Sequence, residues 1–518
     1  KVDTISENTS ANGVAVDGVT LKDGAVGAAG TATSVAGIPF YSADSSIYTH
    51  DVSGTDSTAQ QNAAYGTNAL DAITTGDANT AIGFGSSSGV TTGTRNVALG
   101  RSSLDSPDTE NDNLAIGYNA LAGAINGGEF NVAIGNYALD ALTSGDYNVA
   151  IGYEAGSSLT THNSDVLIGY QAGKALSTGD DGVIAIGYQA GLALTTCSSS
   201  VFIGKNAGDG HDTEDHNMGI GRHALGGSVA GGEYNVAIGS YSLDALTSGD
   251  YNVAVGYNSG TAINSGEAHT LVGNEAGRKI TTSAHNTCIG YFAGGELTTG
   301  ATNIAIGSLA LDGCDTESNN VAIGFAALGG AVAGGEYNVA VGNYTLDALT
   351  SGDQTTALGH NAATRLTTGN FCTYLGSEAG VQVTTGNHNV GIGYQSGGSE
   401  ATSTGSENTT LGNYAGFGIT SGSSNTIIGY DCAHNISTGD YNIAIGLDAG
   451  TSGSPGGNIT TGSSIIALGD ENIGACHIQT DWTVASDQRD KTDFTALDVG
   501  LDFINDLKPY TYKWDKRS

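Results

Sequence analysis

The pattern of apolar and polar positions repeats about every 17 residues over residues 65–469. In a typical copy an apolar residue, an alanine and a second apolar residue precede a glycine, as in Val132–Gly135. Such a short alternating run predicts a β-strand. A repeat of this length has no room for a helix as well. The pattern therefore predicts an all-β fold, a parallel β-solenoid or β-roll in which each repeat forms one coil.

The residue before the repeat glycine is Ile, Val or Leu in all 24 copies except at Tyr65. A mostly β-branched residue lies two positions earlier, as Val132 does relative to Ile134. Side chains two residues apart share one face of a strand. We expect this face to be the buried one, so that Ile238 and its equivalents stabilise the coils. The alanine between them, such as Ala133, would then face outward and meet another chain.

Asparagine occupies the fourth position before the glycine in 17 of the 24 copies, including Asn131, Asn148 and Asn235. Stacked amides can hydrogen-bond from one coil to the next, so an asparagine ladder is predicted. Gly-Asp or Gly-Asn pairs supply a turn before the next strand. At roughly 4.8 Å per coil, 24 coils would make a rod on the order of 110 Å long.

A second period covers six coils. The segment Gly127–Asn131 returns as Gly231–Asn235 and again as Gly334–Asn338. This recurrence indicates duplication of a six-coil block, and we expect the extra residues of the segment to loop out of one coil in each block.

Composition supports a repetitive protein, because 82 glycines, 4 prolines and 13% charged residues are unusual for a globular domain. The formal charge of −36 with only 16 Lys and Arg residues argues against a nucleic acid or an anionic membrane as partner. No apolar run approaches the ~20 residues needed to span a bilayer, and no signal peptide opens the chain. We expect a soluble protein without membrane insertion.

The six cysteines are far apart and form no CxxC pair, so zinc and redox spacings are lacking. They are interpreted as free, mostly buried thiols. The segment His211–His216 contains imidazoles and carboxylates that could bind a divalent cation, but a surface turn is the favoured interpretation. No metal site and no cofactor are predicted.

Six of the 16 basic residues and Trp514 follow Ala485, which indicates a different domain there. The chain is therefore divided into an N-terminal segment (1–60), the coil rod (61–470), a connector (471–485) and the start of another domain (486–518). In this last part, a helical apolar face ends before Pro509 and alternating aromatic residues follow, which predicts a small α+β segment.

The coil motif resembles the head repeats of trimeric autotransporter adhesins, which form a left-handed parallel β-roll with three chains around one axis. The resemblance covers roughly residues 60–470 and implies a parallel homotrimer. Residues 3–24 look like a segment that is common in phage fibre proteins.

The segments Ser486–Lys491, Gly500–Asn505 and Leu507–Pro509 resemble the start of the self-cleaving chaperone domain of phage endosialidases and tail fibres. By this resemblance Ser486 would be the nucleophile and Lys491 its activator, cutting the bond after Ala485. The chemistry is reasonable, because a desolvated lysine can deprotonate a nearby hydroxyl. A solvated polar loop without catalysis is the open alternative.

These observations favour a structural fibre of a phage virion, a tail fibre or similar appendage, that is extracellular and acts as a rigid spacer. Its expected partners are two further copies, other virion proteins and a host surface glycan or protein. The alternative is an enzyme, either a glycan-degrading tailspike or a peptidase that processes only itself. A glycosidase needs a pair of carboxylates in a groove, and the repeat predicts none.

Overall fold

The computed structural model describes residues 14–16, 19–21, 33–35, 38–43, 46–49, 58–106, 108–179, 181–228, 231–331, 334–454 and 456–475. The chain divides into two units, Lys1–Glu471 and Asn472–Ser518. Every regular element among the described residues is a β-strand, in agreement with the predicted all-β class. The predicted α+β segment after residue 485 lies outside the described residues.

Five strands precede the coils: β1 (Val14–Val16), β2 (Val19–Leu21), β3 (Thr33–Val35), β4 (Ile38–Ala43) and β5 (Ser46–Tyr48). The coil strands are β6 (Ala63–Tyr65), β7 (Thr80–Ile82), β8 (Val97–Leu99), β9 (Leu114–Ile116), β10 (Val132–Ile134), β11 (Val149–Ile151), β12 (Val166–Ile168), β13 (Ile184–Ile186), β14 (Val201–Ile203), β15 (Met218–Ile220), β16 (Val236–Ile238), β17 (Val253–Val255), β18 (Thr270–Val272), β19 (Thr287–Ile289), β20 (Ile304–Ile306), β21 (Val321–Ile323), β22 (Val339–Val341), β23 (Thr356–Leu358), β24 (Thr373–Leu375), β25 (Val390–Ile392), β26 (Thr409–Leu411), β27 (Thr426–Ile428), β28 (Ile443–Ile445) and β29 (Ile466–Leu468).

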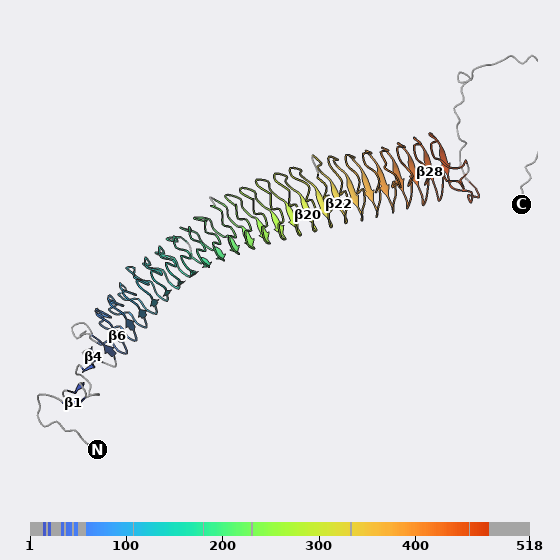
Figure 1. Cartoon of the computed structure of the whole chain (residues 1–518). Coiled ribbons are helices and arrows are strands. Elements are labelled where there is room, and N and C mark those ends of the chain that lie inside the picture. Colours follow the sequence, from blue (N-terminus) through green and yellow to red (C-terminus); the bar gives the residue numbers. More distant parts are fainter. Residues whose placement is uncertain are drawn as a thin grey trace, which may run out of the picture. The chain divides into compact units, whose positions relative to one another are not determined.

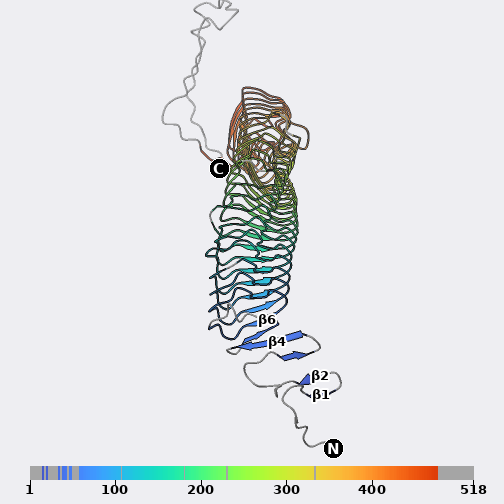
Figure 2. The same ribbon diagram turned by 90° about the vertical axis from the view of Figure 1, so that its left-hand side faces the viewer.

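The coil strands form one row in which consecutive strands pair in parallel, from β6 to β29. The register places equivalent residues opposite each other, so that Ala133 of β10 pairs with Ala150 of β11. Figure 1 shows the strands side by side along one edge of the stack, and Figure 2 shows the same stack of coils from the side. The predicted parallel β-solenoid with coils of about 17 residues is confirmed.

The prediction of the buried strand face was wrong. In β10 the central Ala133 is fully buried, whereas Val132 and Ile134 are only half-buried. Ile238 of β16, expected to stabilise the core of its coil, is 36% exposed. The alanine column therefore points into the coil, and the Val and Ile columns point out of it.

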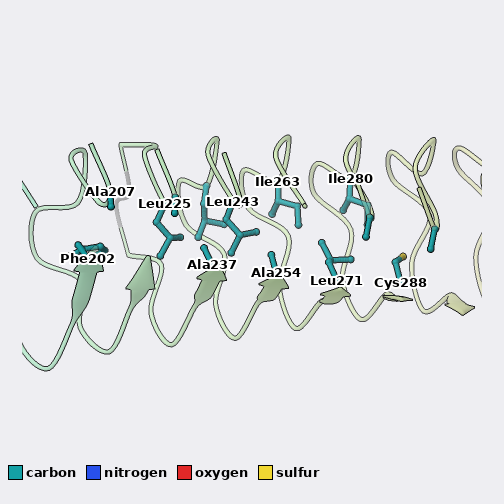
Figure 3. Close-up of a cluster of buried hydrophobic side chains, with 14 of the residues drawn as sticks. Phe202, Ala207, Leu225, Ala237, Leu243, Ala254, Ile263, Leu271, Ile280 and Cys288 are labelled. Carbon is teal, nitrogen blue, oxygen red and sulfur yellow. The ribbon is translucent and has the colours of Figure 1, made fainter. Parts of the chain in front are cut away.

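The turn segments across the coil from the strands explain why the alanines point inward. Leu139 and Leu142, from the turn segment after β10, are fully buried and fill the interior opposite Ala133. In this coil the large turn side chains leave room only for a small residue on the strand. Figure 3 shows the same arrangement farther along, where Ala237 and Ala254 point from their strands toward side chains of the turn segments.

The asparagine ladder is confirmed. Asn131 is fully buried, and its backbone N–H donates to Asn113 Oδ1 at 2.9 Å. Its Nδ2 donates to the Gly145 carbonyl in the next coil at 2.8 Å, and its Oδ1 accepts from the Asn148 N–H at 2.9 Å. Each amide thus links three successive coils through bonds that are shielded from water.

Glycine is required where each strand ends. At Gly135 the backbone φ is +137°, a value that side chains rarely tolerate, and a Cβ there would overlap the carbonyl oxygen of Gly152. The column of repeat glycines therefore lets successive coils approach each other at this corner.

Candidate interaction surface and buried polar sites

Two apolar columns, which we call the strand face, cover the outside of the strand row. They consist of the first and third residues of β6 to β29, nearly all Val, Ile, Leu or Thr. Individual members are substantially exposed, including Ile82 (44%), Leu358 (49%) and Ile466 (55%). A continuous apolar strip of this kind is unusual on a protein that stays monomeric.

Aromatic columns border the strand face on both sides. Before the strands, Phe130 stacks on Tyr147 with ring centroids 5.0 Å apart. After the strands, Tyr170 stacks on Tyr153 and on Tyr188 at 5.5 and 5.1 Å. The parallel register brings these residues together, because positions 17 or 18 residues apart become neighbours.

Basic residues interrupt the second aromatic column and stack on its rings. The Arg101 guanidinium lies 5.8 Å from the Phe84 centroid and 5.6 Å from that of Tyr118. Lys205 lies 5.5 Å from the Tyr188 ring. Where the column lacks an aromatic residue, the basic side chain makes a cation–π contact with a neighbouring ring.

The His211–His216 segment is not the predicted surface turn throughout, because His211 and Glu214 are buried. Burial lowers the pKa of His211 to about 4. The Glu214 carboxylate accepts hydrogen bonds from its own loop and, at 2.9 Å, from the Gly231 N–H of the next coil. No cluster of three metal-binding side chains occurs among the residues that the structure describes.

The glutamate contact recurs once in each six-coil block. Glu110 and Glu317 are buried like Glu214, and their Oε1 atoms accept from the N–H groups of Gly127 and Gly334 at 2.9 and 2.8 Å. A Cβ on Gly127, Gly231 or Gly334 would meet no atom within 4 Å, so these residues project outward as predicted. The sequence signal for this glutamate contact is the Asp-Thr-Glu segment that recurs before each of the three loops.

Coil stacking also creates a carboxylate pair that sequence reasoning missed. The Oδ1 atoms of Asp312 and Asp347 lie 3.1 and 3.0 Å from the position that a Cβ of Gly329 would take. Partial burial, and then the charge of Asp347, raise the pKa of Asp312 to about 6. Burial also raises the pKa of Asp347. The charge of Asp347 therefore disfavours ionisation of the half-buried Asp312 carboxyl.

Five of the six cysteines belong to the described residues, and all five are buried free thiols, as predicted. Burial raises the pKa of Cys197 to about 12, so the thiol stays protonated and unreactive. Cys476 lies outside the described residues, as do the candidate catalytic residues Ser486 and Lys491. None of the described residues forms a helix that is long and apolar enough to cross a membrane.

Residues 486–518 match the family described as chaperone of endosialidase, and the match begins at Ser486. A search of curated proteins finds no match to this chain. The chaperone match and the β-solenoid together fit a phage tail fibre or tailspike type of protein, and such proteins are associated with the virion.

Proposed function

We propose that this chain forms the shaft of a phage fibre, a rigid spacer that holds the host-attachment end away from the virion. The observation that carries the proposal is the single uninterrupted strand row, β6 to β29, in a chain whose residues 486–518 match the chaperone family. A solenoid of this kind has a fixed length set by the number of coils. Extracellular placement and binding to a host surface glycan or protein belong to the same proposal.

Imaging of whole virions with an antibody against the coils tests this function. The fibre proposal expects label along an appendage, and blocked adsorption of virions when purified fibre is added to host cells. Label inside the capsid, or none on intact virions, would refute a fibre. If the antibody labels an appendage but purified fibre does not block adsorption, the spacer role stands and the role in host attachment is refuted.

We further propose that the fibre is a parallel homotrimer that associates through the strand face. At about 4.8 Å per coil, the strand face is on the order of 110 Å long and roughly 10 Å wide, or about 1,000 Å² per chain. Exposed apolar patches on monomers seldom exceed a few hundred Å², whereas stable interfaces bury about 800 Å² from each partner. The estimated area supports association along the whole shaft.

Parallel copies match this surface because equivalent coils then lie at the same height. The resemblance to adhesin head repeats favours three copies around one axis. In such an arrangement each chain contacts two neighbours, so the aromatic columns on both sides of the strand face would contribute. The Arg101 and Lys205 stacks would then lie at the rim, where a charged group can stay hydrated.

Self-cleavage at the Ala485–Ser486 bond is proposed on the resemblance and the family match from Ser486 onward. Ser486 Oγ would pass its proton to Lys491 and attack the Ala485 carbonyl, the Ala485–Ser486 C–N bond would break as the departing nitrogen takes the proton from Lys491, and water would hydrolyse the resulting ester to the Ala485 carboxylate and the free Ser486 hydroxyl. Gel electrophoresis of the complete protein compared with Ser486→Ala and Lys491→Ala tests this step. A wild-type chain that never shortens would remove the peptidase and leave only a folding role.

A glycan-degrading enzyme is the second candidate, and Asp312 with Asp347 is the observation that favours it. A carboxyl group with a pKa near 6 can act as a general acid, and a second carboxylate is what glycosidases require. Release of reducing sugar from host polysaccharide, abolished by Asp312→Asn, would support this alternative. We expect no release of reducing sugar. Partial burial and the charge of Asp347 are sufficient to raise the pKa of Asp312, so the raised pKa does not require a catalytic role.

A further inference from the structure

Tyr374 is the largest departure from the alanine column. It occupies the central position of β24 and is 1% exposed, where most coils have alanine. The ring fits because Gly380 and Gly391 lack side chains, and a Cβ on either would collide with ring atoms. Phe202 fits into β14 in the same way, against Gly208 and Gly219. An aromatic ring thus packs here without a hydroxyl, so the Tyr374 hydroxyl needs a separate explanation.

No contact between the hydroxyl and a described residue has the distance and angles of a regular hydrogen bond, although Cys372 and Asn389 lie near enough to affect its pKa. The Cys372 thiol donates to the Gly386 carbonyl at 3.3 Å, and Asn389 Nδ2 uses one of its two hydrogens on the Gly405 carbonyl at 2.8 Å, so neither side chain is oriented primarily toward the hydroxyl. Burial raises the pKa of Tyr374 well above its usual value, so the hydroxyl stays protonated. A buried donor without an acceptor is costly, and native proteins rarely leave one unpaired.

A small cavity adjoins this site. It has about 10 Å³ of room for the centre of a water molecule, close to the smallest space that holds one water. Its lining combines apolar side chains with polar groups of Tyr374, Asn389, Ser403, Gly405 and Thr410. The Gly405 carbonyl already accepts from Asn389 and has a second lone pair, and the buried Ser403 carries a hydroxyl.

The cavity also lies where the hydrophobic core is interrupted. One continuous core cluster ends at Val383, and the next begins at Ala415. Between them the interior holds the buried hydroxyl groups of Ser396, Ser403 and Thr410 in place of leucine and alanine. Ser396 Oγ donates to Thr410 Oγ1 at 2.8 Å, and Thr410 Oγ1 donates to the Val390 carbonyl at 3.1 Å. Val383, Val390 and Ile419 complete the cavity lining, so a water bound there would be held by the few polar groups that border the cavity.

We propose that this cavity is a binding site for one structural water molecule, which accepts a hydrogen bond from the Tyr374 hydroxyl. The water donates to the Gly405 carbonyl and exchanges a hydrogen bond with the Ser403 hydroxyl. It thereby satisfies the buried hydroxyl and fills the gap between the two core clusters. The site is independent of the proposed fibre function, because it needs only the fold of the coils around β24 to β26.

A crystal structure of the complete protein, at a resolution that reveals ordered water, tests the proposal directly. We expect one water within hydrogen-bond distance of Tyr374 Oη and of a group on Ser403 or Gly405. A cavity without water, or a Tyr374 hydroxyl bonded only to protein, would overturn the proposal.

Melting of Tyr374→Phe gives a second, independent test. If a water accepts the hydrogen bond of the Tyr374 hydroxyl, removal of the hydroxyl leaves the melting temperature unchanged or lowers it. If the hydroxyl is unsatisfied, its removal relieves a penalty, and a variant that melts higher than the parent contradicts the proposal. Tyr441→Phe is the matched control, because Tyr441 is 68% exposed and its hydroxyl can reach solvent.

Discussion

Adjacent residues of one strand have opposite environments in this solenoid, and β16 shows this most clearly. Ala237 is fully buried inside the coil, whereas Ile238 lies on the strand face and is 36% exposed. The burial of the small residue and the exposure of the large one reverse the usual expectation for a strand.

We predict different outcomes for aspartate at these two positions. Ala237→Asp places an unpaired charge inside the coil and should destabilise it by several kcal/mol or prevent folding. Ile238→Asp should keep the circular dichroism spectrum of the parent while weakening association of the chains. Circular dichroism and light scattering on both variants check this, and equal loss of folded structure in both would refute the assigned faces.

The asparagine ladder gives a prediction for a single buried amide. In Asn235→Ala, the Asn252 N–H and the Gly249 carbonyl lose partners that are now 2.9 and 2.8 Å away. The expected loss is about 1–3 kcal/mol for each buried group left unpaired. Thermal melting measures it, with Asn126→Ala as control because the Asn126 side chain is exposed. Equal melting of the two variants would mean that the ladder does not stabilise the coils.

The Asp312 carboxyl predicts how stability depends on pH. Its pKa is raised to about 6 in the folded chain from an ordinary value of 3.8, so the folded state binds the proton more tightly. The stabilising contribution of the Asp312 carboxyl to the free energy of unfolding is therefore fully present below pH 3.8 and is lost as the pH rises through 6. Asp312→Asn should melt higher than the parent at pH 8, and this difference should shrink at pH 5. A difference that grows on acidification would contradict the assigned pKa.

At the scale of elements, the sequence predicted the position of every coil strand, because the glycine that ends each strand is visible in the repeat. It did not predict the buried face. A run of three apolar residues has no polar side to indicate solvent, and only the leucines of the turn segment settle which side is inside. The Asp312 and Asp347 pair was also hidden, because these residues are neighbours only through the stacking of coils.

The local backbone is another reason for the limits of sequence reasoning. Leu139 has a φ of +49° and Tyr147 a φ of +60°, values that are uncommon for residues with a side chain. Equivalent residues of other coils also have positive φ values, which indicates that the stacking of coils imposes these turns. Local preference would not have placed these residues there, so the shape of each coil depends on its neighbours.

The buried glutamates predict a local effect in each six-coil block. Glu214→Ala removes the acceptor of the Gly231 N–H, so the loop should exchange its amide hydrogens faster and be cut sooner by protease. The coils on either side should keep their protection. Asp212→Ala is the control, because the Asp212 side chain is exposed. Unchanged exchange in Glu214→Ala would show that the glutamate does not hold the loop.

At the scale of the whole molecule, the strand face links the fold to the proposed fibre. Each coil contributes only a small apolar area, but the parallel register adds these areas into one strip. Registration of several such strips is a kinetic problem, because many equivalent coils can pair out of step. A chaperone segment that aligns the chains first would solve it, which is consistent with the family match at residues 486–518.

The mass of the complete protein in solution, measured by light scattering, tests association through the strand face most directly. We predict a mass three times that of the 51.7 kDa chain. We also predict a shift toward the mass of one chain when Ile186 and Ile203 on the strand face are both changed to lysine. The control Thr161→Lys adds a positive charge on an exposed turn and should leave the trimer intact. A parent protein with the mass of a single chain, folded and stable with its strand face in water, would contradict the account.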